Sequence, residues 1–245
     1  MRYYTLPTSH SGAIAPVNET EAPIAYWVEG SVLTQPDAVP GNVTVATWSG
    51  TLAGTDGPFA ADVRNWSQAA RSELHDKLDK LVKVAAFKKA EGKLLLRPHA
   101  RHILNDWHTC SRFMAARALA GDTRTRLLID PAALLTEQML ARSVEHLERT
   151  FEQVGLMLRD ETVREQIGGV VISNLRRAEA GSGAVDPLGV DEGEALLPTT
   201  LTDERGLLDV SLLGRLARAH LVTGTPVVFV GGSGTGDSQR RLIEG

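Results

Sequence analysis

The stretch KLLLRPHARHILND, residues 93–106, changes abruptly from apolar to polar character. The run from Leu94 to Leu96 has no polar interruption, which is typical of a strand that is buried on both faces. Arg97 and Pro98 end this run, and Asn105 or Asp106 has the side chain of a helix N-cap. The stretch therefore predicts a strand that leads through a polar turn into a helix, which is the repeating unit of an α/β fold.

Similar units lie on both sides of this stretch. Amphipathic helical patterns separate the apolar runs, and the first of them is predicted to end at Gly92, a residue typical of helix C-caps. The other apolar runs are VTVATW (43–48), RLLID (126–130), GGVVISN (168–174) and PVVFV (226–230). Residues 43–245 thus predict five β/α units and a parallel sheet, either open or closed into a barrel.

Residues 1–42 have a different pattern. RYYTL, GAIAPV and IAYWV each read as a short strand, which brings the total to eight. The prolines of this segment leave no room for full helices between the strands, since a β/α unit needs roughly 30 residues. We expect a single domain over 1–245, a TIM-barrel-like β/α repeat with a reduced, helix-poor N-terminal part. The alternative is that 1–42 wraps around a smaller sheet.

Composition excludes several classes of protein. The 245 residues include 26 Lys and Arg and 30 Asp and Glu, so the net charge of −4 predicts no nucleic-acid-binding face. A single cysteine, Cys110, excludes an internal disulfide and a Cys-rich zinc site. No apolar stretch approaches the ~18 residues of a membrane span, and the first residues lack a secretory apolar region. We therefore expect a cytoplasmic protein with no membrane partner.

Four segments carry a resemblance to a known superfamily. KLLLRPHARHILND is similar to a strand ending in Leu-Glu-Pro-His with a later Asn, and RLLIDPAALL is similar to Leu-Leu-Asp-Pro-Ala-His-Leu-Leu. GGVVISNLRR is similar to a strand ending in Val-His-Leu-Lys-Asp, and residues 197–230 to the segment that leads into the last strand. From about residue 43 onward, the order of motifs resembles the xylose isomerase-like TIM barrels. This superfamily of sugar phosphate isomerases and epimerases also includes endonuclease IV-type enzymes.

The resemblance implies a divalent metal at the C-terminal mouth of the barrel, held by Glu, Asp, His and Glu from successive strand ends. In this chain Arg97 takes the place of the first Glu, and Ala133 replaces the His that follows Asp130. Asn174 stands at the later His and Val230 at the last Glu. Since a guanidinium cannot ligate a cation, we expect no cofactor, and a divalent metal only with a non-standard ligand set.

The replaced residues suggest an anion site instead. Arg97, Arg176 and Arg177 would meet at the mouth, where forked guanidinium groups suit carboxylates and phosphates. The glycine-rich turn after the last strand, with Gly232 and Gly234, occupies the region where TIM barrels often bind phosphate. Arg97 could instead pair with Asp130 across adjacent strand ends, and the turn could be an ordinary flexible loop.

Two further residues are candidates for ligand binding, Asn174 and Trp48. Trp48 ends its strand where it could stack on a sugar ring or simply pack. Candidate catalytic residues are Asp130 and His99, and together with His102 they could form a rebuilt metal site.

Three functions therefore stay open. The first is a degenerate barrel, a pseudoenzyme of carbohydrate metabolism, that binds a small anionic carbohydrate-like ligand. The second is an active isomerase, epimerase or lyase with a site rebuilt around His99 and Asp130. The third is a subunit or interaction protein completed by a partner chain, and the sequence is also compatible with a homo-oligomer.

Overall fold

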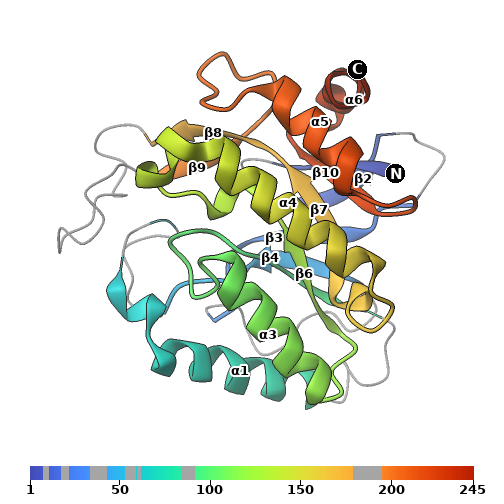
Figure 1. Ribbon diagram of the computed structural model, residues 1–245. Coiled ribbons are helices and arrows are strands. Elements are labelled where there is room, and N and C mark those ends of the chain that lie inside the picture. The colour runs from blue at the N-terminus through green and yellow to red at the C-terminus, as the bar shows by residue number, and fades with distance from the viewer. Residues whose placement is uncertain are drawn as a thin grey trace.

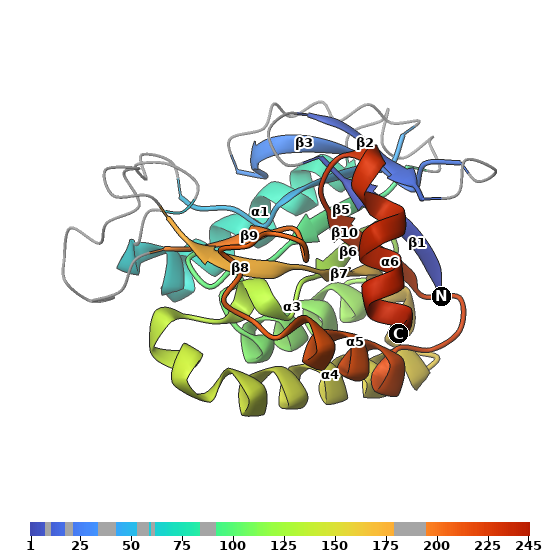
Figure 2. The same cartoon turned by 90° about the horizontal axis from the view of Figure 1, so that it is seen from above.

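The computed structural model describes residues 1–7, 11–17, 22–33, 43–52, 59, 62–83, 92–178 and 195–245. Eight strands close into a barrel in the order β1-β10-β7-β6-β5-β4-β3-β2. Helices α4 and α5 lie along one side of the barrel, and β2 and β3 lie at the opposite side (Figures 1 and 2). The prediction of an α/β barrel is confirmed at this level.

The barrel is mixed rather than fully parallel. Strand β2 (Gly12–Pro16) runs antiparallel to both of its neighbours, and the other barrel strands are parallel to one another. The parallel strands are β1 (Arg2–Leu6), β3 (Ala25–Ser31), β4 (Val45–Trp48), β5 (Leu94–Arg97), β6 (Thr125–Ile129), β7 (Ile167–Ile172) and β10 (Pro226–Val230). Strands β4, β5, β6, β7 and β10 coincide with the apolar runs quoted above.

The antiparallel strand explains how so short an N-terminal segment completes the barrel. Two parallel neighbours need a crossover of a dozen or more residues, whereas antiparallel neighbours need only a turn. By inserting β2 between β1 and β3, the chain passes from one to the other through two short connections. The described strands of this segment, β1, β2 and β3, are therefore part of the barrel itself.

The helices begin close to their expected positions. Asp106 caps α3 (Trp107–Leu119). Its carboxylate accepts the Thr109 amide at 2.6 Å, and the Thr109 hydroxyl accepts the Asp106 amide at 3.2 Å, as in a capping box. The helix expected before Gly92 is divided into a 3₁₀ turn (Val63–Trp66) and α1 (Gln68–Lys83), and residues 84–91, which precede the predicted C-cap, lie outside the described residues. The remaining helices are α4 (Ser143–Arg159), α5 (Val210–His220) and α6 (Gly236–Glu244). No described helix has the length and apolar character to cross a membrane.

Side chains alternate along each strand between two cores. The outer core joins the barrel to its helices, and Leu94 and Leu96 belong to it. The inner core fills the barrel with twelve side chains. These are Tyr4, Leu6, Ile14, Ala25, Trp27, Ala46, Trp48, Leu95, Leu128, Val171, Val228 and Val230. Because successive side chains point to opposite faces, Arg97, Asp130 and Ser173 follow Leu95, Leu128 and Val171 into the interior.

A buried ion pair lies at the opposite end of the barrel from these polar residues. Arg117 of α3 donates from Nε to Asp122 Oδ2 at 2.8 Å, and Asp122 Oδ1 accepts the amides of Arg124 and Thr125 at the start of β6. Arg117 also donates from Nη1 to Asp79 Oδ1 at 2.7 Å, which links α3 to α1. One guanidinium therefore joins two helices to a barrel strand.

We expect Asp122→Asn to lower the free energy of unfolding by about 3 kcal/mol, because it leaves a buried guanidinium without its full counter-charge. Asp79→Asn is the matched control. Its side chain is 49% exposed, so its loss should cost less than about 1 kcal/mol. Urea unfolding of both variants checks the difference, and equal losses would contradict this account.

Candidate functional site

A cavity of about 440 Å³ lies at the C-terminal ends of the parallel strands. Strand ends form its floor, and a two-stranded arm, β8 (Asn174–Arg177) and β9 (Leu196–Thr199), forms part of its wall. Figure 2 shows this arm extending outward from the end of β7. The lining residues are Leu6, Pro7, Trp27, Glu29, Trp48, Phe59, Arg97, Arg176, Leu197, Pro198, Thr199, Thr200, Asp203, Arg205 and Val230.

Arg97 and Asp130 form an ion pair at the floor of this mouth cavity. Arg97 Nη2 donates to Asp130 Oδ2, and the two side chains are 2% and 0% exposed. Asp130 also accepts the Ser173 hydroxyl at 3.0 Å and the Ala133 amide at 3.3 Å. The pairing considered for Arg97 in the sequence is therefore present, and protein donors already occupy both oxygens of Asp130.

The Arg97 guanidinium also lies over the ring of Trp48, with Cζ 4.5 Å from the ring centroid. Its Nε is buried and has no hydrogen-bond partner among the described residues. Burial lowers the pKa of Arg97 and the adjacent Asp130 raises it, with burial the larger effect, but an arginine stays protonated in a protein at any ordinary pH. The charged guanidinium of Arg97 is thus held at the cavity floor, and its Nε–H makes no hydrogen bond to a described residue.

Trp48 is packed on several sides. Trp27 and Phe59 meet its ring edge-on, with centroids 5.3 and 5.2 Å away. Arg97 covers one face of the ring. Trp48 therefore contributes to the cavity by holding Arg97 and closing the wall.

His99 lies beside this cluster but does not line the cavity. Its Nδ1 accepts the amide of Arg101 at 3.2 Å, so the ring proton sits on Nε2, which donates to the carbonyl of Leu196 at 2.9 Å. Burial, followed by the neighbouring His102, holds the pKa of His99 well below its usual range. Both nitrogens of a neutral imidazole are therefore engaged, and the hydrogen bond from Nε2 joins the segment that follows β5 to strand β9.

Of the other residues predicted to bind a ligand, only some line the mouth cavity. Arg176 lines the mouth cavity, whereas Arg177 points elsewhere and donates to Glu137 at 2.6 Å. Asn174 donates to the Leu208 carbonyl at 3.0 Å and accepts the amide of the same residue at 2.9 Å. The Asn174 side chain thus fixes the segment that precedes α5, and the structure does not bring it to the cavity.

Gly232 and Gly234 also lie outside the cavity lining, on the exposed turn that leads into α6. In this turn Thr235 donates from its amide and its hydroxyl to the carbonyl of Gly232. No neighbouring atom lies within 4 Å of the Cβ position at either glycine. Hydrogen bonds within the turn therefore hold its shape, and no described atom lies close enough to require glycine at these two positions.

Sequence reasoning missed several cavity residues, among them Glu29 and Asp203. Glu29 could have been found from the alternation Ala25, Trp27, Glu29 along β3, which places all three on one face. Asp203 lies in a segment without periodicity, so no pattern placed it. The Asp203 carboxylate accepts the Thr199 hydroxyl at 2.6 Å, and this hydrogen bond is the main cause of its lowered pKa.

Metal binding was considered for His99, His102 and Asp130. Within the described part of the chain, no three His, Cys, Asp or Glu side chains gather where they could hold a metal ion. These three residues are all described, so they do not form the facial set that a metal would need.

We expect His99 to make the protein less stable below pH 6.5. In the unfolded chain His99 binds a proton near pH 6.5, while the folded chain binds it only at much lower pH. The contribution is therefore fully present above pH 6.5 and is lost as the pH falls, by up to about 1.4 kcal/mol per pH unit. Urea unfolding at pH 7 and pH 5 should show a larger loss for the wild type than for His99→Gln. Parallel losses in the two proteins would contradict the assignment.

A scan against models of known protein families finds no match to this chain, and a search among curated proteins finds none either. The resemblance to the xylose isomerase-like barrels therefore rests on the order of four motifs and stays a prediction. Any function of the chain must be argued from the side chains that the barrel brings together.

Proposed function

We propose that this chain is a reduced member of the xylose isomerase-like barrels that has lost the metal chemistry of the superfamily. In this proposal it binds a small anionic carbohydrate, a sugar acid or a sugar phosphate, in the mouth cavity. The support is the eight-stranded barrel, the motif order, and the position of an arginine where the superfamily has a metal-binding glutamate.

The observation that carries this proposal is that the side chains of two arginines, Arg97 and Arg176, line the mouth cavity. Hydrogen bonds to charged groups are worth roughly 1.5–3 kcal/mol, so an anionic ligand gains more from these side chains than a neutral one does. Arg97 is held at the cavity floor by its pair with Asp130, and Arg176 lines the same cavity as a second cation.

The rest of the lining suits a polyhydroxylated body. The carboxylates of Glu29 and Asp203 and the threonines at 199 and 200 offer acceptors and donors for hydroxyl groups. Trp27 and Phe59 supply apolar surface. The cavity volume of about 440 Å³ lies within the usual range for small-ligand sites.

The other two functions have less support. An active site on His99 and Asp130 would need a group free to move a proton, yet the ring nitrogens of His99 and the oxygens of Asp130 already have protein partners. A subunit completed by another chain would need a gap in the sheet. The barrel closes through β1, β2 and β3 and leaves none.

We expect calorimetric titration with glucuronate or glucose 6-phosphate to show saturable binding, and glucose to bind at least about tenfold more weakly because it lacks the charge. The two anions distinguish a carboxylate site from a phosphate site. Arg176→Gln should weaken binding of the preferred anion about tenfold. Its neighbour Arg177→Gln is the matched control, because Arg177 pairs with Glu137 away from the cavity.

The buried pair is tested by removing both charges together, in Arg97→Met with Asp130→Asn. This double variant leaves no uncompensated buried charge, so it should fold and should lose the anion. Anion binding that is unchanged in this variant and in Arg176→Gln would overturn the proposal. Thermal stabilisation by Mn²⁺ or Zn²⁺ that disappears in Asp130→Asn would instead favour an active metal enzyme.

A further inference from the structure

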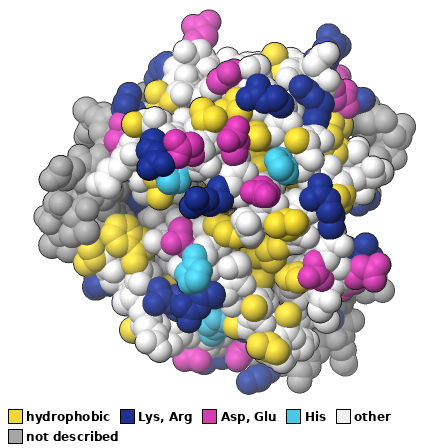
Figure 3. All heavy atoms as spheres, viewed as in Figure 1, with side chains coloured by type: hydrophobic (Ala, Val, Ile, Leu, Met, Phe, Trp, Pro, Cys, Tyr) yellow, Lys and Arg dark blue, Asp and Glu magenta, His cyan; other side chains and the backbone are white. Residues whose placement is uncertain are grey.

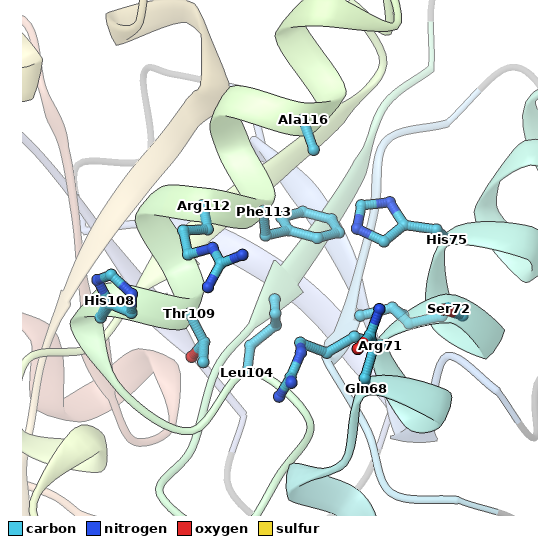
Figure 4. A pocket seen from close by; sticks show the side chains of 11 residues that line it. Gln68, Arg71, Ser72, His75, Leu104, His108, Thr109, Arg112, Phe113 and Ala116 are labelled. Atoms are coloured by element: carbon cyan, nitrogen blue, oxygen red, sulfur yellow. The ribbon is translucent and has the colours of Figure 1, made fainter.

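A second cavity lies outside the barrel, between α1 and α3, and has a volume of about 390 Å³. Figure 4 shows its side chains projecting from both helices. The lining residues are Gln68, Arg71, Ser72, Leu74, His75, Leu104, His108, Thr109, Arg112, Phe113 and Ala116. This interhelical cavity is separate from the mouth, since the two cavities have no lining residue in common.

The charge of the interhelical cavity is one-sided. Two arginines and two histidines line it, and none of its described lining residues carries a carboxylate. Figure 3 shows basic and histidine side chains side by side on this face, over α1 and α3. In Figure 4, Arg71 and Arg112 extend toward each other from the two helices, with Leu104 between them. Neither guanidinium pairs with a carboxylate among the described residues, whereas Arg97, Arg117 and Arg177 each do.

Arg71 is held in place. Its Nη1 donates to the carbonyl of Trp66 at 2.8 Å, which fixes the guanidinium at the N-terminal end of α1. A held guanidinium loses less side-chain freedom when it binds an anion than a freely moving one does. The guanidinium groups of Arg71 and Arg112 carry like charges, and an anion between them offsets their repulsion.

The floor of this cavity is apolar. Leu74 and Leu104 are buried, and Phe113 packs against the His75 ring with centroids 5.3 Å apart. Burial and the nearby Arg117 lower the pKa of His75, while Asp79 and Asp76 act in the opposite direction. His75 is therefore mainly neutral at pH 7 and contributes an aromatic wall, so the cavity suits a ligand with a flat or apolar body.

We infer that the interhelical cavity binds a small organic phosphate, with its phosphate group between Arg71 and Arg112 and its apolar body against Phe113 and Leu74. Phosphate is favoured over a single carboxylate because its oxygens can accept from both guanidinium groups at once. The inference is independent of the mouth cavity and of any carbohydrate that binds there.

Phenyl phosphate is the probe, because it carries both the phosphate and a flat apolar body. We expect saturable binding by ³¹P line broadening and calorimetry, with inorganic phosphate and phenol each at least about tenfold weaker. Arg112→Gln and Arg71→Gln should each weaken phenyl phosphate about tenfold. Arg149→Gln, an exposed arginine of α4, is the matched control and should bind within about twofold of wild type.

Three outcomes would overturn this inference. One is the absence of saturable binding, and the second is equal binding by Arg112→Gln and Arg149→Gln. The third is inorganic phosphate that binds as tightly as phenyl phosphate, which would remove the role of the apolar floor. Because Arg176→Gln alters only the mouth, unchanged phenyl phosphate binding in that variant separates this site from the proposed carbohydrate site, whichever of the two fails.

Discussion

The pleat of the barrel strands determines which side chains meet at the mouth of the barrel. A side chain that points inward is followed two residues later by another inward side chain, so the register of the apolar interior also decides which polar groups meet above it. Leu95, Leu128 and Val171 fill the interior, and the next inward positions carry an arginine, an aspartate and a serine. A one-residue slip of β5 would turn Arg97 toward the outer core and away from Asp130. The ion pair and the closed barrel therefore depend on the same register.

Much of the barrel could be predicted because its strands are apolar on both faces. The runs at 43–48, 94–96 and 226–230 are short, mainly apolar and separated by helical patterns. The direction of β2 could not be predicted in this way, since no local pattern distinguishes a parallel strand from an antiparallel one. The one indication was that residues 1–42 are too few to hold three strands together with the helical crossovers that parallel strands need. The closed sheet shows how that shortage is met.

The candidate site was harder to predict because its residues meet through long-range contacts. Strand position placed Arg97 and Asp130 together, and both alternatives for Arg97, pairing and ligand binding, were visible in the sequence. Asn174 was placed at the mouth by resemblance, but its amide instead fixes the backbone of Leu208, thirty-four positions along the chain. The sequence also makes His99 a candidate reactive group, whereas in the structure both of its ring nitrogens bond to backbone groups. Such contacts depend on where distant loops return, which sequence periodicity does not encode.

The antiparallel strand β2 has a consequence for how this barrel can diverge. On the helical side, each connection at the mouth leads into a packed helix, so a change in its length disturbs the outer core. The connection from β1 to β2 leads from one strand into its antiparallel neighbour and not into a helix. Lengthening such a turn costs little, since loop-closure entropy rises only slowly with length. Leu6 and Pro7, where β1 ends, already line the mouth. This sector of the rim is therefore where insertions would be tolerated best, and where new ligand preferences could arise without refolding the barrel.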